Sequence, residues 1–279
     1  MITKHIEFFD PVKIADSGQA FRIHPIDDTH TELLAYGKYL QIASLGGDDY
    51  AFSCSEQDFN DVWQEYFDLS FDYKAAIYDT DKDDEFLQAS IRYGYGIRIL
   101  RQEVFETVIS YIISQRRSIP SITTCVDRLC ELSGDQVVPP VLEEPFVKPL
   151  KDAYYSFPTI KQASSLTADK IDGIGAGYRT AYILSAVEDF RSGKLVPDSM
   201  NELNDDELFS VLTGMYGVGT KVANCVMLFG FHRVGRFPVD VWIKRIEDKY
   251  YDGHFDAERY HHTAGILQQF MFYYIRNEA

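Results

Sequence analysis

The chain has 279 residues, of which 46% are hydrophobic and 14% aromatic, so it can bury a substantial core in two or three subdomains. Its net charge of −16 argues against a protein that holds nucleic acid by overall charge. No apolar run is long enough to span a bilayer and no signal segment opens the chain, so we expect a cytoplasmic protein without membrane contact. The four cysteines are scattered and fit neither a disulfide framework nor a zinc site.

Short β-rich runs separated by turn residues predict an antiparallel sheet in the first part of the chain. These runs are Glu7–Phe9, Phe21–His24, Glu32–Tyr36 and Tyr39–Ala43. A helix is expected near residues 55–67. Together these elements predict an N-terminal antiparallel-sheet (α+β) domain, which we place at residues 1–83.

The segment from Glu56 to Glu85 is strongly acidic. It contains eleven acidic residues against Lys74 and Lys82, a local charge of −9. Such a surface is expected to lie far from DNA. A protein-docking face is an alternative function for it.

From about Asp84 onward, apolar residues recur at the three- to four-residue spacing that is typical of helices. One stripe comprises Phe105, Val108, Ile109, Ile112 and Ile113, and a second comprises Tyr182, Ile183, Ala186 and Phe190. Prolines and a glycine cluster at 173–177 separate the helices. The predicted fold class is therefore α+β, with the sheet domain followed by a mainly helical domain over residues 84–279. Cys125 and Cys130 are expected to be core residues of one helix.

The most informative stretch runs from Gly217 to Cys225 and contains Lys221. The residues from Val222 onward predict a buried helix. An ammonium group in such a place must find a partner or become a neutral amine, which is a nucleophile. Gly217 and Gly219 allow a tight turn, whose N–H groups at a helix N-terminus can hold a phosphate. A phosphate-binding turn next to a buried amine indicates a reaction on a nucleic acid.

The same residues also have ordinary structural explanations. A lysine in a first helical turn usually extends to water. Asp240 follows Pro238 and precedes a helical run, so it can be only an N-cap. The two roles of Asp240 are compatible, because a capping aspartate stays ionised and can also face a reacting centre. The local charge favours DNA, since five basic residues between Gly214 and Arg245 accompany a single aspartate, a balance of +4.

Residues 212–246 resemble the helix-hairpin-helix and Gly/Pro/Asp element of the DNA glycosylase superfamily, although Tyr216 stands where a proline is typical. Four further segments resemble motifs of the 8-oxoguanine DNA glycosylases, in family order: Ser17–Arg22, Gly96–Glu103, Tyr155–Pro158 and Gly175–Arg179. The resemblance covers nearly the whole chain. It implies an N-terminal α+β domain and a catalytic domain of two helical subdomains with a cleft between them.

The resemblance implies a bifunctional glycosylase and lyase that acts on double-stranded DNA containing 8-oxoguanine in base excision repair. Lys221 would attack the sugar C1′ and form a Schiff base, and Asp240 would stabilise the cationic sugar. No cofactor is required, the cysteine quartet of the iron–sulfur glycosylases is absent, and a monovalent cation at the hairpin carbonyls is implied by the family alone. Gly217 and Gly219 would contact the DNA backbone. We expect a monomer associated with the nucleoid through DNA.

Recognition of the damaged base is implied for four residues. Gly18 occupies the family position of a backbone carbonyl that accepts from N7–H of 8-oxoguanine and stays unpaired against guanine. Gln268 would bond the Watson–Crick edge, while Phe272 and Cys225 would contact the two faces of the base. Without the resemblance, Gly18 would be interpreted as a turn glycine, and Phe272 and Cys225 as core residues.

Extrusion of a base leaves a gap that side chains fill. The resemblance assigns the filling to the turn that contains Gln115, Arg116 and Arg117. Tyr178 would be a wedge beside the orphaned base, and Arg179 would contact that base. A solvated helix end explains the turn equally well.

Two residues depart from the eukaryotic pattern. Ser121 stands where we expect an arginine that enforces cytosine opposite the lesion, and serine cannot make that bidentate contact. Trp242 stands where a histidine is expected, and would stack on DNA or fill the pocket wall. These departures resemble a bacterial member, with looser discrimination of the opposite base.

Two other functions remain open. An alkylpurine glycosylase of the same superfamily uses water and lacks a catalytic lysine, so Lys221 argues against it. A non-catalytic helix-hairpin-helix DNA-binding protein would depend on charge for affinity, so the acidic balance argues against that.

Overall fold

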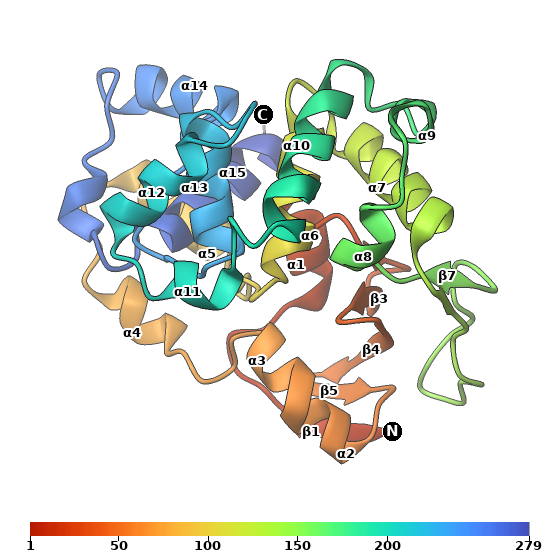
Figure 1. Ribbon diagram of the computed structural model, residues 1–279. Helices are drawn as coiled ribbons and strands as arrows, with labels where there is room; N and C mark the ends of the chain where they lie inside the picture. The colour runs from red at the N-terminus through yellow and green to blue at the C-terminus, as the bar shows by residue number, and fades with distance from the viewer. Residues whose placement is uncertain (279) are drawn as a thin grey trace.

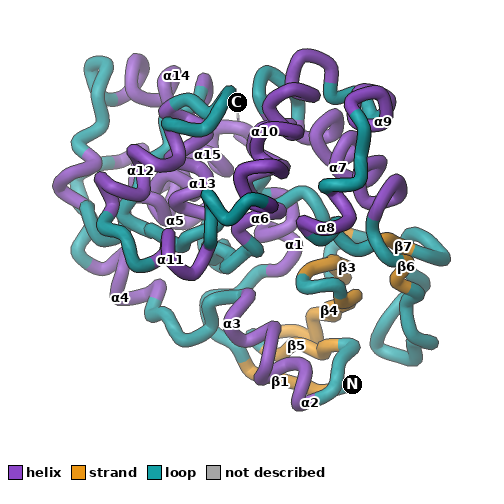
Figure 2. Tube along the Cα trace, viewed as in Figure 1, coloured by secondary structure: helices purple, strands orange, loops and turns teal. Residues whose placement is uncertain are grey.

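The computed structural model describes residues 1–278 and contains an antiparallel sheet followed by a mainly helical region (Figure 1). The sheet has five strands in the order β1-β5-β4-β3-β2. Figure 2 shows these strands gathered at one end of the molecule, with helices making up most of the rest. This arrangement confirms the predicted α+β fold class. None of the helices within residues 1–278 has both the length and the apolar character needed to cross a membrane.

The strands are short and antiparallel throughout. They are β1 Ile2–His5, β2 Ile23–Pro25, β3 His30–Ala35, β4 Lys38–Gly46 and β5 Asp49–Phe52. A two-residue turn at Tyr36 and Gly37 joins β3 to β4, and both residues have positive φ, 52° and 69°. This is the turn geometry that matches the right-handed twist of paired strands.

One of the four predicted runs is not a strand, and two strands, β1 and β5, were not predicted. Residues 7–9 do not form a strand, because Phe8 has a φ of 53°, which takes the backbone out of the extended region. The first strand lies just before them and pairs with β5. Strand β5 itself was missed, since its four residues follow the glycine turn at 46–47 so closely.

The helix predicted near residues 55–67 is confirmed, with one irregular turn. It begins at α2 Glu56–Asp58, continues through a π-helical turn at Phe59–Trp63, and ends with α3 Gln64–Tyr66. Ser55 caps its start by accepting from the N–H of Asp58. Its fully buried Trp63 and Phe67 pack on the sheet strands and close the N-terminal core.

The remaining chain is mainly helical. The helices are α1 Pro11–Asp16, α4 Tyr73–Tyr78, α5 Glu85–Tyr93, α6 Val104–Ser114, α7 Ile119–Ser133, α8 Ile160–Ala163, α9 Ala168–Gly173, α10 Thr180–Arg191, α11 Pro197–Asn201, α12 Asp205–Thr213, α13 Thr220–Phe229, α14 Val241–Tyr250 and α15 Ala264–Glu278. Short 3-10 turns lie at Gly177–Arg179 and Ala257–Tyr260, and a small hairpin pairs β6 Gln136–Val137 with β7 Tyr154–Tyr155.

Helix α6 is the centre of the helical core. Its residues from Thr107 to Ile113 are all buried, and it packs against α7, α10 and α13. Cys125 and Cys130 lie buried on α7, as expected, and neither is in a disulfide. Both apolar stripes predicted from the sequence therefore face this core.

The two cores interlock. Leu100 belongs to the sheet core, whereas Phe8 and Phe21 from the N-terminal part belong to the helical core. The domain boundary at residue 83 stays a prediction.

A buried carboxylate, Asp68, joins the two parts at their junction. It is 1% exposed, and it accepts hydrogen bonds at 2.9 Å from Tyr73 Oη and from Arg101 Nε. His232 Nε2 lies 3.1 Å from the second carboxylate oxygen. Burial acts to raise the pKa of Asp68, but His232, Arg101 and Tyr73 together hold it below its ordinary value. The carboxylate therefore stabilises the fold above the pKa of an unfolded aspartate, and this contribution is lost as the pH falls through the folded pKa.

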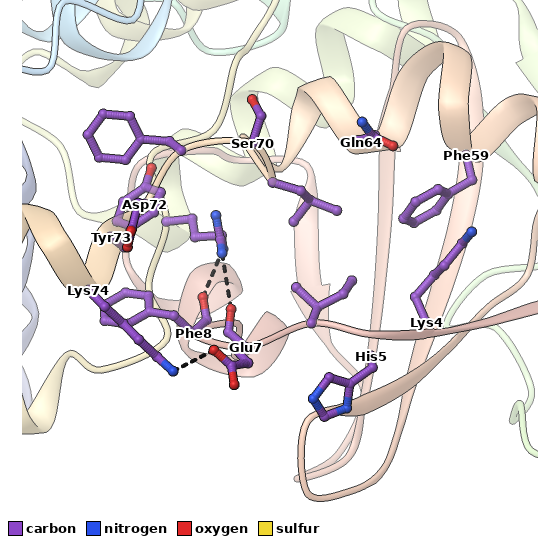
Figure 3. A pocket seen from close by; sticks show the side chains of 14 residues that line it. Lys4, His5, Glu7, Phe8, Phe59, Gln64, Ser70, Asp72, Tyr73 and Lys74 are labelled. Carbon is purple, nitrogen blue, oxygen red and sulfur yellow. Dashed lines mark hydrogen bonds and ion pairs between the residues drawn. The ribbon is translucent and has the colours of Figure 1, made fainter.

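The Arg98 side chain also stabilises this junction, by binding main-chain carbonyl groups. Its guanidinium donates to the carbonyls of Phe8, Asp68 and Glu7 at 2.8, 2.7 and 3.0 Å. It forms part of the wall of an open hollow of about 590 Å³, where Lys74 pairs with Glu7 at 2.6 Å (Figure 3).

Candidate active site

A cavity of about 970 Å³, lined by apolar and charged side chains, lies in the helical region. Its wall comes from the turn after α1, the loop between α6 and α7, the starts of α13 and α14, and the end of α15. Eight of the predicted site residues line it: Gly18, Gln115, Arg116, Arg117, Lys221, Asp240, Trp242 and Phe272. Residues more than 250 positions apart in the chain thus meet at one site.

Lys221 lies in the first turn of α13 and is half-buried. Its Nζ is 5.3 Å from the centre of the Tyr111 ring, and no carboxylate within residues 1–278 forms an ion pair with it. Tyr111 is 4% exposed and stacks on Phe229. Burial raises the pKa of Tyr111 well above its ordinary value, so the phenol stays neutral and offers the ammonium only its ring face.

Cys225 lies one turn after Lys221 on the same helix and is buried. Burial raises the pKa of its thiol, while the nearby Lys221 ammonium acts in the opposite direction. The thiol is therefore neutral and offers the lysine a polarisable neighbour without a counter-charge.

Asp240 is the N-cap of α14, as the sequence predicted. Its Oδ1 accepts from the N–H groups of Trp242 and Ile243, both at 2.9 Å. Within the described residues its second carboxylate oxygen accepts no hydrogen bond. The carboxylate is thus fixed by a helix N-terminus, with one oxygen left for the cavity.

The hairpin before α13 packs on a tyrosine. Gly217 has a φ of 83°, and a Cβ there would lie 2.2 Å from the ring of Tyr182. Tyr216 stacks edge-to-face on the same ring at 4.8 Å, and Tyr178 does so at 5.9 Å. The tyrosine in place of the usual proline therefore joins the hairpin to the predicted wedge.

The predicted filler loop is hydrogen-bonded to both neighbouring loops. Gln115 Nε2 donates to the Gly217 carbonyl at 3.0 Å, and the guanidinium of Arg117 donates to the Gly175 carbonyl. Arg179 donates to the Gln115 carbonyl and is 5% exposed. Arg179 also donates to the Ala176 carbonyl, so two of its guanidinium nitrogens are already bonded within the protein.

Six predicted residues lie outside the cavity wall. Tyr178, Arg179, Gly217 and Gly219 lie in the loops beside the filler loop, and Cys225 and Gln268 lie buried behind the wall. The side-chain oxygen of Gln268 is buried with no hydrogen-bond partner in the described part of the chain. Such an atom is costly unless a donor reaches it.

Gly18 occupies a tight corner of the cavity. It has a φ of 76°, and a Cβ there would lie 2.8 Å from Ile119 Cδ1 and 3.3 Å from both Phe272 and Arg276. Only glycine fits this conformation and space. Ser121 is exposed and does not line the cavity, although the adjacent Pro120 does.

Several cavity residues were missed by sequence reasoning. They are Asp16, Tyr111, Lys244, Arg276 and Asn277. Tyr111 lies within an apolar helical stripe and looks like an ordinary core residue. Arg276 carries a detectable signal, because it follows Phe272 by four positions and so lies on the same face of α15.

Comparison with known proteins agrees with this geometry. Residues 1–108 match the 8-oxoguanine DNA glycosylase, N-terminal domain. The fold superposes on the crystal structure of the Clostridium acetobutylicum 8-oxoguanine glycosylase/lyase, solved with dsDNA containing cytosine opposite 8-oxoG. The TM-score is 0.88 and the identity 32%, and the match covers 98% of this chain and 93% of that one.

Two curated relatives carry related names. An N-glycosylase/DNA lyase of Saccharomyces cerevisiae is 34% identical over 167 residues, 56% of this chain and 42% of that protein. A probable N-glycosylase/DNA lyase of Methanothermobacter thermautotrophicus is 27% identical over 242 residues, 76% of this chain and 73% of that protein. The match thus spans less than half of the yeast protein. The chain belongs to the 8-oxoguanine DNA glycosylase/lyase family, which confirms the resemblance found in its sequence motifs.

The two hairpin glycines offer a matched test of this site. Gly217→Ala should destabilise the fold by about 2 kcal/mol or more, because it adds left-handed strain to a clash with the Tyr182 ring. Gly219→Ala should cost at most about 1 kcal/mol, since a Cβ at Gly219 meets no atom within 4 Å. Urea unfolding of both variants measures the difference. Equal destabilisation would show that the hairpin does not pack as described.

Proposed function

We propose that the protein is a bifunctional DNA glycosylase and lyase that excises 8-oxoguanine from duplex DNA in base excision repair. The observation that carries this proposal is Lys221, whose amine faces the same cavity as the fixed carboxylate of Asp240 and lacks an ionised partner. Family membership supports the choice of substrate.

The chemistry follows from these two side chains. The neutral Lys221 amine attacks C1′ of the extruded nucleotide, the bond from C1′ to the base breaks, and the base leaves with the electron pair and takes up a proton. Opening of the sugar ring gives a Schiff base at C1′. Loss of a proton from C2′ then expels the 3′ phosphate, which cleaves the strand. Asp240 stabilises the positive charge on the sugar as the base departs.

Gly18, Phe272 and Trp242 would bind the base. The Gly18 carbonyl accepts from N7–H of 8-oxoguanine, and guanine, which lacks that hydrogen, leaves the carbonyl unpaired. Phe272 stacks on one face of the base, and Trp242 closes the wall beside Asp240. The unpartnered oxygen of Gln268 supports a further contact, with N–H groups on the Watson–Crick edge. Cys225 would contact the other face.

Duplex binding would use the loops beside the cavity. Gln115, Arg116 and Arg117 fill the space left by the extruded base, Tyr178 wedges next to the orphaned base, and Arg179 contacts it. Gly217 and Gly219 offer N–H groups to a phosphate at the start of α13. Arg116 and Arg117, which line the cavity, supply local attraction that the acidic chain as a whole lacks.

Three further features belong to the proposal. The protein acts as a monomer in the cytoplasm, associated with the nucleoid through DNA. Its chemistry requires no cofactor. A monovalent cation held by hairpin carbonyls would only support the phosphate contact.

Borohydride should trap a covalent adduct between Lys221 and a duplex containing 8-oxoguanine, because reduction fixes the Schiff base. Lys221→Gln should abolish the adduct while retaining binding of the lesion. Lys244→Gln is the matched control, since Lys244 also lines the cavity but pairs with Asp248 at 3.0 Å. Gel analysis of trapped complexes measures both. An undiminished adduct in Lys221→Gln would exclude this lysine as the nucleophile.

Asp240→Asn should slow excision by orders of magnitude, because the charge near the cationic sugar is lost. A side-chain oxygen remains to cap α14, so the free energy of unfolding should change by less than about 1 kcal/mol. Single-turnover excision and urea unfolding test the two effects separately, with exposed Asp248→Asn on the same helix as control. Normal excision by folded Asp240→Asn would leave Asp240 as a cap alone.

Excision opposite adenine should compete measurably with excision opposite cytosine. Arg179 alone would support the cytosine preference, and each bidentate contact contributes about 1–3 kcal/mol of discrimination. Ser121→Arg should sharpen the preference and Arg179→Ala should weaken it. Single-turnover rates against all four opposite bases measure this. A strict cytosine requirement in the native protein would assign the missing contact to Arg116 or Arg117.

A further inference from the structure

The turn that carries Gly18 is held by its neighbours at nearly every carbonyl. The Asp16 carbonyl accepts from the Arg276 guanidinium, and the Ser17 carbonyl accepts from Gln269 Nε2 at 2.6 Å. The Gln19 carbonyl accepts from Gln102 Nε2 at 2.9 Å and from Tyr111 Oη at 3.2 Å. Within residues 1–278 the Gly18 carbonyl is the one in this turn that accepts no hydrogen bond.

Arg276 makes the closest attachment between this turn and the cavity wall. Besides the Asp16 carbonyl, it binds the Asp16 carboxylate, with Nη2 2.7 Å from Oδ2. The Arg276 side chain is 17% exposed, whereas that of Asp16 is 48% exposed. A guanidinium suits this position because it donates to a carbonyl and a carboxylate at once from one planar group.

The same guanidinium also lies against Phe272. Its Cζ is 5.6 Å from the centre of the Phe272 ring, and both residues are on α15. Arg276 therefore contacts both the Phe272 ring, which would stack on the base, and the turn of Gly18, whose free carbonyl would accept a hydrogen bond from the edge of the base. Arg276, together with Gln269 on the same helix, therefore fixes the spacing between these two contacts.

We propose that Arg276, through its pair with Asp16, is a positioning residue that sets the Gly18 carbonyl relative to the Phe272 ring and thereby determines selection of the oxidised base. This inference rests on the proposed excision of 8-oxoguanine. Arg276 acts through Gly18 and Phe272, and it takes no part in the attack by Lys221.

The role can be separated from the chemistry by comparing two duplexes. Excision of 8-oxoguanine requires the base to be read, whereas cleavage at a preformed abasic site uses Lys221 without a base. Arg276→Met should slow single-turnover excision of 8-oxoguanine by about ten- to a hundredfold, the cost of displacing a reading group by a fraction of an ångström to an ångström. Cleavage of the abasic duplex should stay within about twofold of the native rate.

Two further variants keep the test decisive if Arg276→Met folds poorly. Arg276→Lys retains the charge but not the double contact, and should show a smaller loss confined to 8-oxoguanine. Asp16→Asn leaves Arg276 intact and should lower excision in the same direction. Arg191→Met, which breaks an exposed arginine pair with Glu188 on α10, is the control and should change neither rate.

Three results would overturn the positioning role. They are unchanged excision by all three variants, an equal loss on the abasic duplex, and a loss in Arg276→Met with native behaviour in Asp16→Asn, which would make Arg276 a direct substrate contact. Failure of the proposed function would be distinct, because the native protein itself would then leave 8-oxoguanine in place.

Discussion

The ammonium of Lys221 is held over the buried ring of Tyr111 without a carboxylate to neutralise it, and the surrounding elements are arranged around that position. The central helix α6 supplies the ring, and α13 supplies the lysine. Two hydrogen bonds fix Asp240 at the start of α14, and within the described residues it forms no ion pair with Lys221. One carboxylate thus caps a helix and also faces the cavity that holds the lysine.

Local patterns in the sequence predict much of this fold, because they act over a few residues. Alternating and helical periods gave the sheet and the stripes of α6 and α10, and the position of Asp240 before a helical run gave its cap. The fold class, the family and the cap of α14 are confirmed. The assignment of site roles stays a prediction, although most of the residues concerned line one cavity.

The features that sequence reasoning missed depend on contacts between distant segments. The residues around Phe8 in the sequence give no signal of its positive φ. In the structure, the Phe8 carbonyl at this turn accepts a hydrogen bond from Arg98, which is 90 positions away. Arg276 gains its place only because α15 packs beside the end of α1. Likewise, the strongly acidic segment looks unpaired in sequence, yet Glu56, Asp58 and Asp81 pair with basic residues elsewhere in the chain. Part of that negative charge is therefore neutralised by ion pairs.

The hydrogen bonds among the three loops beside the cavity have a consequence for how the protein searches DNA. Gln115 and Arg179 donate to neighbouring carbonyls, so these particular donors reach a duplex only when those bonds are exchanged. An exchange of this kind gains little at an intact base pair, which resists opening, and gains more where a lesion weakens stacking. We therefore expect shorter residence on undamaged sequence than at a lesion, because the exchange of hydrogen bonds gains more where stacking is weakened.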